Sequence, residues 1–159
     1  MAQATRATQA LDQAGVDYRA HHYEVTEKVG EGYGEAVAAA IGFPGDRVFK
    51  TLIAEVDDEP VVAVIPVDRR LSARRLARAV GGKRCSLASP ATAERLTGYV
   101  TGGISPFGQK RSLRLVLDST ATKHATIAVS GGRRGIQLEL SPAALMEVTG
   151  GQVAAISDV

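Results

Sequence analysis

Two neighbouring segments near the middle of the chain carry the hydrophobic pattern of β-strands, and together they predict a hairpin. Residues 48–56 (VFKTLIAEV) and 61–67 (VVAVIPV) are rich in β-branched and aliphatic side chains, and the segment 57–60 (DDEP) between them is typical of a turn. Other runs are shorter but have a similar apolar or alternating character. These additional predicted strands are residues 16–25, 113–118, 126–130, 136–140 and 152–156.

Helices are predicted where a capping residue precedes an apolar or alanine-rich stretch and a glycine follows it. Ser72 fits a helix N-cap, and Ser89 and Ser141 are each followed by a proline, which is tolerated at the first helical position. The glycine-rich segment 26–34 has no apolar period and is predicted to be a loop. The predicted helices are residues 4–14, 35–41, 72–80, 90–98 and 142–150.

The order of these elements predicts a mixed α/β (α+β) fold. Strands and helices do not alternate strictly, as they would in a doubly wound parallel sheet. A curved, mostly antiparallel, barrel-like sheet with helices packed around it fits the order better. The length of 159 residues favours a single domain over residues 1–159, because no repeat or interdomain linker divides the chain.

Composition excludes several classes of protein. The hydrophobic content of 45% rules out whole-chain disorder, and no apolar run approaches the roughly 18–20 residues of a membrane-spanning helix. The N-terminal stretch lacks the pattern of a secretory signal. The single cysteine, Cys85, excludes an internal disulfide and a multi-cysteine zinc site, and the three histidines lack the spacing of metal ligands. A reducing cytoplasm is therefore the expected location.

The net charge of +2 is too small to argue for nucleic-acid binding, but the basic residues are grouped. Each group could be a solvated surface, and that interpretation stays open. A shared anionic partner is the alternative, because every phosphate contact needs a cation. The groups are the arginines of residues 69–78, the pair Lys83 and Arg84, the pair Lys110 and Arg111, and the pair Arg133 and Arg134.

Lys50 lies within the most strand-like segment of the chain, flanked by Phe49, Leu52 and Ile53. A charged ammonium in such a strand must reach water or an anion. In one interpretation Lys50 points out to solvent while Phe49 points into the core, as strand alternation allows. In the other, the ammonium lies at the floor of a cleft and binds a carbonyl or phosphate oxygen, with the Thr51 hydroxyl beside it.

Two glycine-rich segments could form walls of such a cleft. Residues 101–110 (TGGISPFGQK) contain paired glycines that allow the backbone to approach a ligand, and Pro106 stiffens the turn. Residues 130–135 (SGGRRG) lie between two predicted strands, and both segments could equally be ordinary turns. Neither matches GxxxxGK[ST] or GxGxxG, and the chain has no GxSxG motif. The residues alone predict a cleft with one lysine and glycine-rich walls for an anionic ligand.

Three segments together are more specific than each alone. The stretches VFKTLIAEV, GYVTGGISPFGQKR and ATIAVSGGRRGIQLEL, in this order and spacing, resemble the YbaK family of aminoacyl-tRNA deacylases, and its Cys-tRNA(Pro) deacylase branch most of all. The resemblance covers nearly the whole chain. It implies the fold of a prolyl-tRNA synthetase editing domain with one pocket, no metal or cofactor, and removal of a mischarged amino acid from tRNA(Pro).

The resemblance also implies roles for individual residues. Lys50 matches the family's key lysine and would anchor the terminal adenosine or its phosphate, and the amides of Gly102 and Gly103 would lie near the reacting carbonyl. Gln137 stands where some members carry aspartate. The basic residues implied to contact acceptor-stem phosphates are Lys110, Arg111, Arg133 and Arg134. The other implied pocket residues are Tyr23, Tyr33, Thr51, Ile104, Ser105 and Pro106.

In the cysteine branch the substrate's own thiol is expected to attack its ester carbonyl and give a thiolactone, so no catalytic triad is needed. The implied partners are the aminoacyl-tRNA acceptor end and prolyl-tRNA synthetase, with no role for a membrane or DNA. Three alternatives remain: an Ala-tRNA(Pro) deacylase that uses water, a non-catalytic module that binds tRNA or synthetase, and a small-anion-binding protein without an RNA role.

Overall fold

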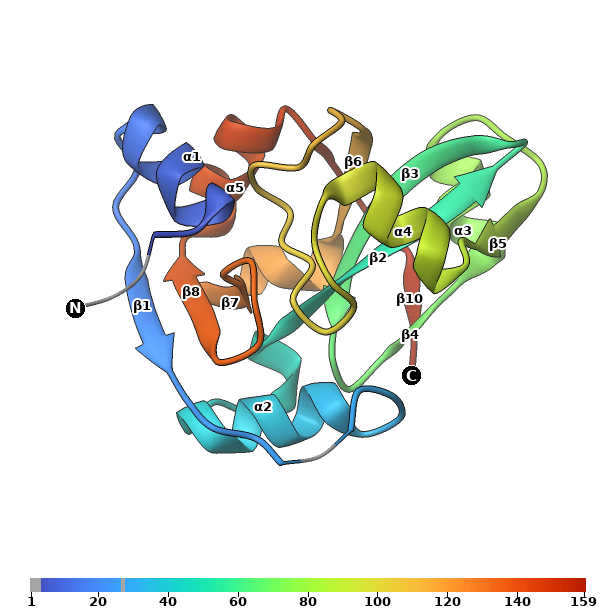
Figure 1. Ribbon diagram of the computed structural model, residues 1–159. Helices are drawn as coiled ribbons and strands as arrows, with labels where there is room; N and C mark the ends of the chain where they lie inside the picture. Colours follow the sequence, from blue (N-terminus) through green and yellow to red (C-terminus); the bar gives the residue numbers. More distant parts are fainter. Residues whose placement is uncertain (1–3, 27) are drawn as a thin grey trace.

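Within residues 4–26 and 28–159, which are the residues that the computed structural model describes, five α-helices surround three β-sheets (Figure 1). Residues 1–3 belong to the N-terminal stretch, and residue 27 belongs to the segment predicted as a loop. These residues lie outside the described part of the chain.

The largest sheet contains the predicted hairpin, formed by β2 (Phe49–Val56) and β3 (Glu59–Pro66). Its turn is made by Asp57 and Asp58, which both have positive φ, as tight hairpins with a right-handed twist require. The sheet has five strands in the order β5 (Cys85–Leu87), β2, β3, β6 (Arg114–Asp118) and β9 (Gln152–Ala154). The pairs β3–β6 and β6–β9 are parallel, so the sheet is mixed.

The second sheet is antiparallel and has the order β1 (Arg19–His22), β8 (Ile136–Leu140) and β7 (Ile127–Ser130). A parallel bridge between Val48 and Ala128 holds it against the start of β2. The short strands β4 (Arg70–Leu71) and β10 (Ser157–Asp158) form the third sheet. Antiparallel pairing dominates the described ladders, which confirms the predicted mixed, mostly antiparallel arrangement.

The predicted serine caps are present. Ser72, Ser89 and Ser141 each accept a hydrogen bond from the backbone N–H three residues later. In Figure 1, α1 and α5 lie together at one end of the molecule, and α2 lies at the lower edge of the view. Among the described residues, no helix combines the length and apolar character needed to cross a bilayer. The helices are α1 (Arg6–Ala14), α2 (Tyr33–Ile41), α3 (Ala73–Ala79), α4 (Pro90–Thr97) and α5 (Pro142–Thr149), with 3₁₀ turns η1 (Gly45–Arg47) and η2 (Ser119–Lys123).

The hairpin is buried on both faces, which explains the almost continuous apolar sequence of β3. Phe49 and Ile53 face a large core cluster that α1, α4 and α5 cover. The alternate residues Ala54 and Ile65 face a second cluster that contains Leu76 of α3. The hairpin is therefore the structural centre of the molecule, and residues near its ends are positioned by both cores.

Three short strands, β4, β5 and β10, do not follow from the sequence pattern. Each has only two or three residues and exists because a distant segment pairs with it. The strand predicted for residues 16–25 is also shorter than expected. It ends as β1 at His22 because its partner β8 begins at Ile136, which pairs with His22.

Glu139 on β8 joins four segments of the structure. Its carboxylate accepts hydrogen bonds from the Thr126 hydroxyl at 2.6 Å and from Arg47 Nη2 at 2.9 Å. His21 Nε2 lies 2.8 Å from its other oxygen. The Thr126 hydrogen bond, together with His21 and Arg47, lowers the pKa of Glu139 below its ordinary value, although burial opposes this shift.

We expect Glu139→Gln to lower the free energy of unfolding at pH 7 by about 1–3 kcal/mol, because charge-assisted hydrogen bonds are lost. The pKa of Glu139 is lower in the folded than in the unfolded chain. Its contribution is therefore fully present above the unfolded pKa of about 4.3 and is lost as the pH falls through the folded value. Urea unfolding of both proteins from pH 7 down to pH 3 checks this prediction. A stability difference that does not shrink in acid would contradict it.

Candidate active site

A cavity of about 540 Å³ opens beside β2. Its other walls come from α2, α4, the segment before α2 and the loop after α4, and Figure 1 shows these segments around β2. The volume falls within the range of about 300–1,000 Å³ that small-ligand pockets occupy. The cavity is therefore large enough for a small molecule or for the end of a larger one.

The cavity lies where β2 lacks a ladder partner on one side. On that side β2 pairs with β5 only from Ala54 to Val56, and it meets β7 at the bridge of Val48. The Ile53 carbonyl accepts from the Ala88 N–H at 2.9 Å, and among the described residues no ladder pair covers residues 49–52 there. The chain leaves the sheet after β5 because Ser89 and Pro90 begin α4. A helix, and not another strand, consequently faces this part of β2.

Lys50 lines this cavity and is partly buried. No ion pair or hydrogen bond in the described part of the chain involves its ammonium. Burial lowers the pKa of Lys50 below its ordinary value, the carboxylates of Glu35 and Asp68 oppose this shift, and Arg70 adds to it. A partly buried cation without a partner is well placed to bind a phosphate or carbonyl oxygen that enters the cavity.

The two interpretations of Lys50 from the sequence each describe part of the structure. Strand alternation holds, because Phe49 is buried in the core and Lys50 takes the opposite direction. On that side Lys50 lines the cavity together with Gly34 and Val37 of α2 and Val67 after β3. Lys50 thus faces a cavity, as the second interpretation expects.

The floor of the cavity, meaning its deeply buried lining residues, is apolar except for a few polar groups. Thr51 is 9% exposed and Gln137 is 5% exposed. Thr51 Oγ1 and Gln137 Oε1 are buried and have no hydrogen-bond partner. Gln137 Nε2 makes one long hydrogen bond, of 3.5 Å, to Tyr23 Oη. Because buried polar atoms are rarely left unpaired, these two oxygens are candidate contacts for a bound group.

The two glycine-rich segments pack closely against each other beside the cavity. A Cβ on Gly103 would lie 2.6 Å from the Arg133 Cα, which only a glycine avoids. Gly102 has a φ of +92°, and a Cβ there would lie 2.6 Å from Val29 Cγ2. Glu94 of α4 fixes the start of the loop, because its carboxylate accepts from the Thr101 N–H at 2.7 Å and the Thr101 hydroxyl at 2.9 Å.

The implied pocket residues divide into two groups. Six of them line the cavity together: Lys50, Gly102, Tyr33, Thr51, Ile104 and Gln137. Tyr23, Gly103, Ser105 and Pro106 lie outside the lining. Ser105 is fully buried, and its hydroxyl accepts from the Phe107 N–H, so it shapes the loop. The Gly103 N–H donates to the Val100 carbonyl at 2.8 Å, so this amide already has a hydrogen-bond partner within the loop.

The side chains near the cavity favour hydrogen bonding and charge over metal ligation. No group of three or more histidine, cysteine, aspartate or glutamate side chains in residues 4–26 and 28–159 could hold a metal ion. The carboxylates closest to the site, Glu31, Glu35 and Asp68, are all exposed. These carboxylates therefore lie towards the solvent-facing opening of the cavity, its mouth, whereas the Lys50 ammonium lies within the lining.

Comparison with known proteins agrees with this geometry. The family model described as the aminoacyl-tRNA editing domain matches residues 32–148, a range that contains Lys50 and both glycine-rich segments. The chain belongs to the aminoacyl-tRNA editing domain family. This confirms the resemblance to the YbaK family.

Two relatives in this family are similar to the chain over most of its length. A candidate Cys-tRNA(Pro)/Cys-tRNA(Cys) deacylase, EbsC of Enterococcus faecalis, is 36% identical over 98% of this chain and 94% of its own length. The multifunctional Ser/Thr-tRNA deacylase ProXp-y of Escherichia coli is 36% identical over 68% of this chain and 64% of its own length. These names support an enzyme that acts on aminoacyl-tRNA.

Two solved structures share the fold of this editing domain. The hypothetical protein APE2540 has a TM-score of 0.84 and 29% identity, covering 97% of this chain and 100% of that one. A candidate trans-editing enzyme for prolyl-tRNA synthetase has a TM-score of 0.85 and 22% identity, covering 99% of this chain and 100% of that one. The predicted fold, similar to that of a prolyl-tRNA synthetase editing domain, is confirmed.

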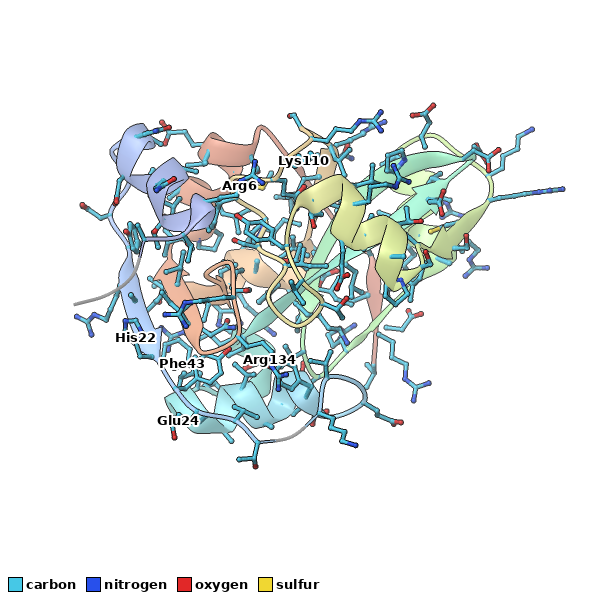
Figure 2. All side chains as sticks on the ribbon, viewed as in Figure 1. Arg6, His22, Glu24, Phe43, Lys110 and Arg134 are labelled. Atoms are coloured by element: carbon cyan, nitrogen blue, oxygen red, sulfur yellow. The ribbon has the colours of Figure 1, made fainter. Side chains whose placement is uncertain are left out.

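The basic residues that the resemblance assigns to RNA lie in two separate places on the editing domain. Arg134 is at the cavity, where its Nε donates to Tyr33 Oη at 3.2 Å and its guanidinium lies over the Tyr33 ring. Figure 2 shows Arg134 just above α2, whereas Lys110 lies beside Arg6 in the upper part of the view. Arg111 lines a different groove of about 430 Å³. Of these four residues, Arg133 and Arg134 lie near the cavity, beside Gly103 and Tyr33.

Two residues that position the glycine-rich loop have no recognisable signal in the sequence. Glu94 holds Thr101, as described above. The hydroxyl of Tyr99 donates to the Phe107 carbonyl, and burial raises the pKa of Tyr99 to about 12, which keeps this donor protonated. Both contacts join residues several positions apart in a segment without regular structure, and a spacing rule does not reveal them.

We expect Gly103→Ala to destabilise the protein by about 1–3 kcal/mol and to lower its activity, because the new Cβ must push the loop away from the Arg133 backbone. Gly150→Ala is the control, since Gly150 ends α5 with a φ of +66° and has open space around its Cβ position. This control should lower the thermal unfolding midpoint but leave the activity unchanged. Equal activity of the Gly103→Ala protein would show that the loop contact does not shape the site.

Proposed function

We propose that this protein is a trans-editing hydrolase that deacylates mischarged tRNA(Pro), with Cys-tRNA(Pro) as its main substrate. The observation that carries the proposal is the Lys50 ammonium, which has no partner in the described chain and lies in a cavity with an apolar floor. Membership of the editing family and the deacylase names of two relatives support it. The cavity suits an aminoacyl ester with its terminal nucleoside, while the rest of the acceptor end stays outside.

The chemistry needs few protein groups, because the substrate carries its own nucleophile. The cysteine thiol loses its proton, and its sulfur forms a bond to the ester carbonyl carbon. The bond from that carbon to the ribose oxygen then breaks, the ribose oxygen takes a proton, and a thiolactone and free tRNA result. Water later opens the thiolactone to cysteine. Lys50 would orient the ester through the terminal nucleoside or its phosphate and stabilise the developing negative charge.

Residues 1–159 would act as one editing domain, with Arg133 and Arg134 against phosphates of the acceptor end. Prolyl-tRNA synthetase would deliver the mischarged tRNA and supply selectivity for tRNA(Pro). Because the substrate belongs to translation, the protein would act in the cytoplasm.

We expect Lys50→Ala to lower kcat/KM for Cys-tRNA(Pro) by about 100–1,000-fold, the usual effect of removing a group that stabilises transition-state charge. Lys50→Arg should be intermediate, because it keeps the charge but replaces a point charge by a planar fork. Lys123→Ala, which changes an exposed lysine on η2, is the matched control and should leave release of labelled cysteine unchanged.

Parallel assays separate this proposal from its alternatives. Normal turnover of Cys-tRNA(Pro) by a folded Lys50→Ala protein would refute the role of Lys50 in catalysis. A clear preference for Ala-tRNA(Pro) over Cys-tRNA(Pro) would favour the water-using alanine enzyme. Salt-sensitive binding of tRNA without any ester cleavage would identify a non-catalytic module.

The position of the basic pairs gives a further expectation. The double variant Arg133→Gln/Arg134→Gln should raise KM for charged tRNA and reduce the salt slope of tRNA binding by about 2, one for each lost phosphate contact. The variant Lys110→Gln/Arg111→Gln should have a smaller effect on KM, because these residues lie away from the cavity. Binding titrations at several salt concentrations test both, and a larger effect of the second pair would reverse the orientation assigned to the tRNA.

A further inference from the structure

We propose that Thr51 and Gln137 select aminoacyl esters whose side chain carries a hydroxyl or thiol, and that they thereby spare alanyl and prolyl esters. The proposal rests on the proposed function and adds to it a basis for substrate choice. It concerns the two buried oxygens of the cavity floor, Thr51 Oγ1 and Gln137 Oε1.

The two residues reach the floor from different sheets. Thr51 lies on β2, and Gln137 lies on β8, where it pairs with Ser130 of β7. The Val48–Ala128 bridge joins the two sheets next to this point. The surrounding floor is aliphatic or aromatic and includes Phe49 and Ile53. An apolar pocket with a few placed polar groups is the usual way in which a protein fixes the identity of a small ligand.

Charge distribution indicates which part of the substrate meets these oxygens. Glu31 lines the cavity and is exposed, and the exposed carboxylates of Glu35 and Asp68 act on Lys50. The α-ammonium that every aminoacyl ester carries is therefore favoured towards the mouth. The floor is neutral: Tyr23 beside Gln137 has a pKa raised by burial, and the Ser130 hydroxyl already accepts from the Gly132 N–H. A neutral side chain suits this floor.

A hydroxyl or thiol can satisfy the floor, whereas a methyl group or a proline ring cannot. Such a group is both donor and acceptor, so it can pair with the Gln137 amide in either orientation of that amide and also with the Thr51 hydroxyl. An alanyl or prolyl ester would leave both buried oxygens unpaired. Sites built to hydrogen-bond a substrate group reject analogues without it far better than apolar pockets reject a small size difference.

The test compares seryl and alanyl esters of tRNA(Pro), which differ only by the hydroxyl. We expect the wild-type protein to prefer Ser-tRNA(Pro) over Ala-tRNA(Pro) by at least about 100-fold in kcat/KM. The variant Thr51→Val/Gln137→Leu should narrow this kcat/KM ratio at least tenfold, because the seryl ester loses its hydrogen-bond partners on the floor. Thr51→Ser keeps the hydroxyl and should keep the ratio, and Thr122→Val, at an exposed site, is the matched control.

A stability measurement separates selection from a structural role. The two buried oxygens are unpaired, and Gln137→Leu removes only the long hydrogen bond of 3.5 Å to Tyr23 Oη, so the double variant should keep a thermal unfolding midpoint close to that of the wild-type protein. The proposal would be overturned if the double variant had a lower thermal unfolding midpoint and an unchanged ratio of kcat/KM for Ser-tRNA(Pro) over Ala-tRNA(Pro). A wild-type protein that cleaves both esters equally well would also overturn it, although cysteine release would then still support the proposed function.

A binding experiment keeps the inference testable if the proposed function fails. Seryl-adenosine and alanyl-adenosine with a 3′-amide in place of the ester resist cleavage and report affinity alone. Tighter binding of the seryl analogue by wild-type protein, lost in the double variant, would support the inference even without deacylation of any tRNA. Equal affinities for the two analogues would refute it.

Discussion

The gap in strand pairing along β2 determines what this structure can do. Successive residues of a strand point to opposite faces, so neighbours such as Lys50 and Thr51 normally face different surroundings. They can line one cavity only if it lies along the strand's edge, where both faces are accessible. β2 provides such an edge because β5 pairs with it only from Ala54 to Val56 before Ser89 and Pro90 turn the chain into α4.

The same gap explains how a lysine can be partly buried without an ion pair. Both faces of the hairpin are covered by core clusters, so the edge has low polarity, and burial lowers the pKa of Lys50. The carboxylates of Glu35 and Asp68 raise this pKa, but in the described residues neither forms an ion pair with Lys50. The ammonium thus remains available to a ligand, whereas a direct salt bridge would occupy it. Unpaired charge of this kind reduces stability and is typical of functional sites.

Local sequence signals account for much of the fold, and long-range pairing accounts for what they miss. The hairpin turn and the serine caps are determined by residues close together in the chain, so their positions follow from the sequence. β5 and β10 have no period of their own, because their partners lie many residues away. At the site, the resemblance points to Lys50 and Gly102. Two hydrogen bonds of the loop are not encoded in residue spacing, because they depend on how the loop folds. The Thr101 N–H donates to the Glu94 carboxylate, and the Gly103 N–H donates to the Val100 carbonyl.

The close contact between Gly103 and the Arg133 backbone has a further consequence for how the site is organised. It places Arg134 beside Gly102 at the mouth, while Gln137, three residues later and already within β8, lies in the floor. One short segment therefore carries a cation towards the outside and a neutral amide towards the inside. Contacts to a charged polymer and contacts to a small side chain are then made by separate groups with opposite solvent exposure. Because one set depends on screened charge and the other on buried hydrogen bonds, salt should affect binding of the polymer far more than the choice among side chains.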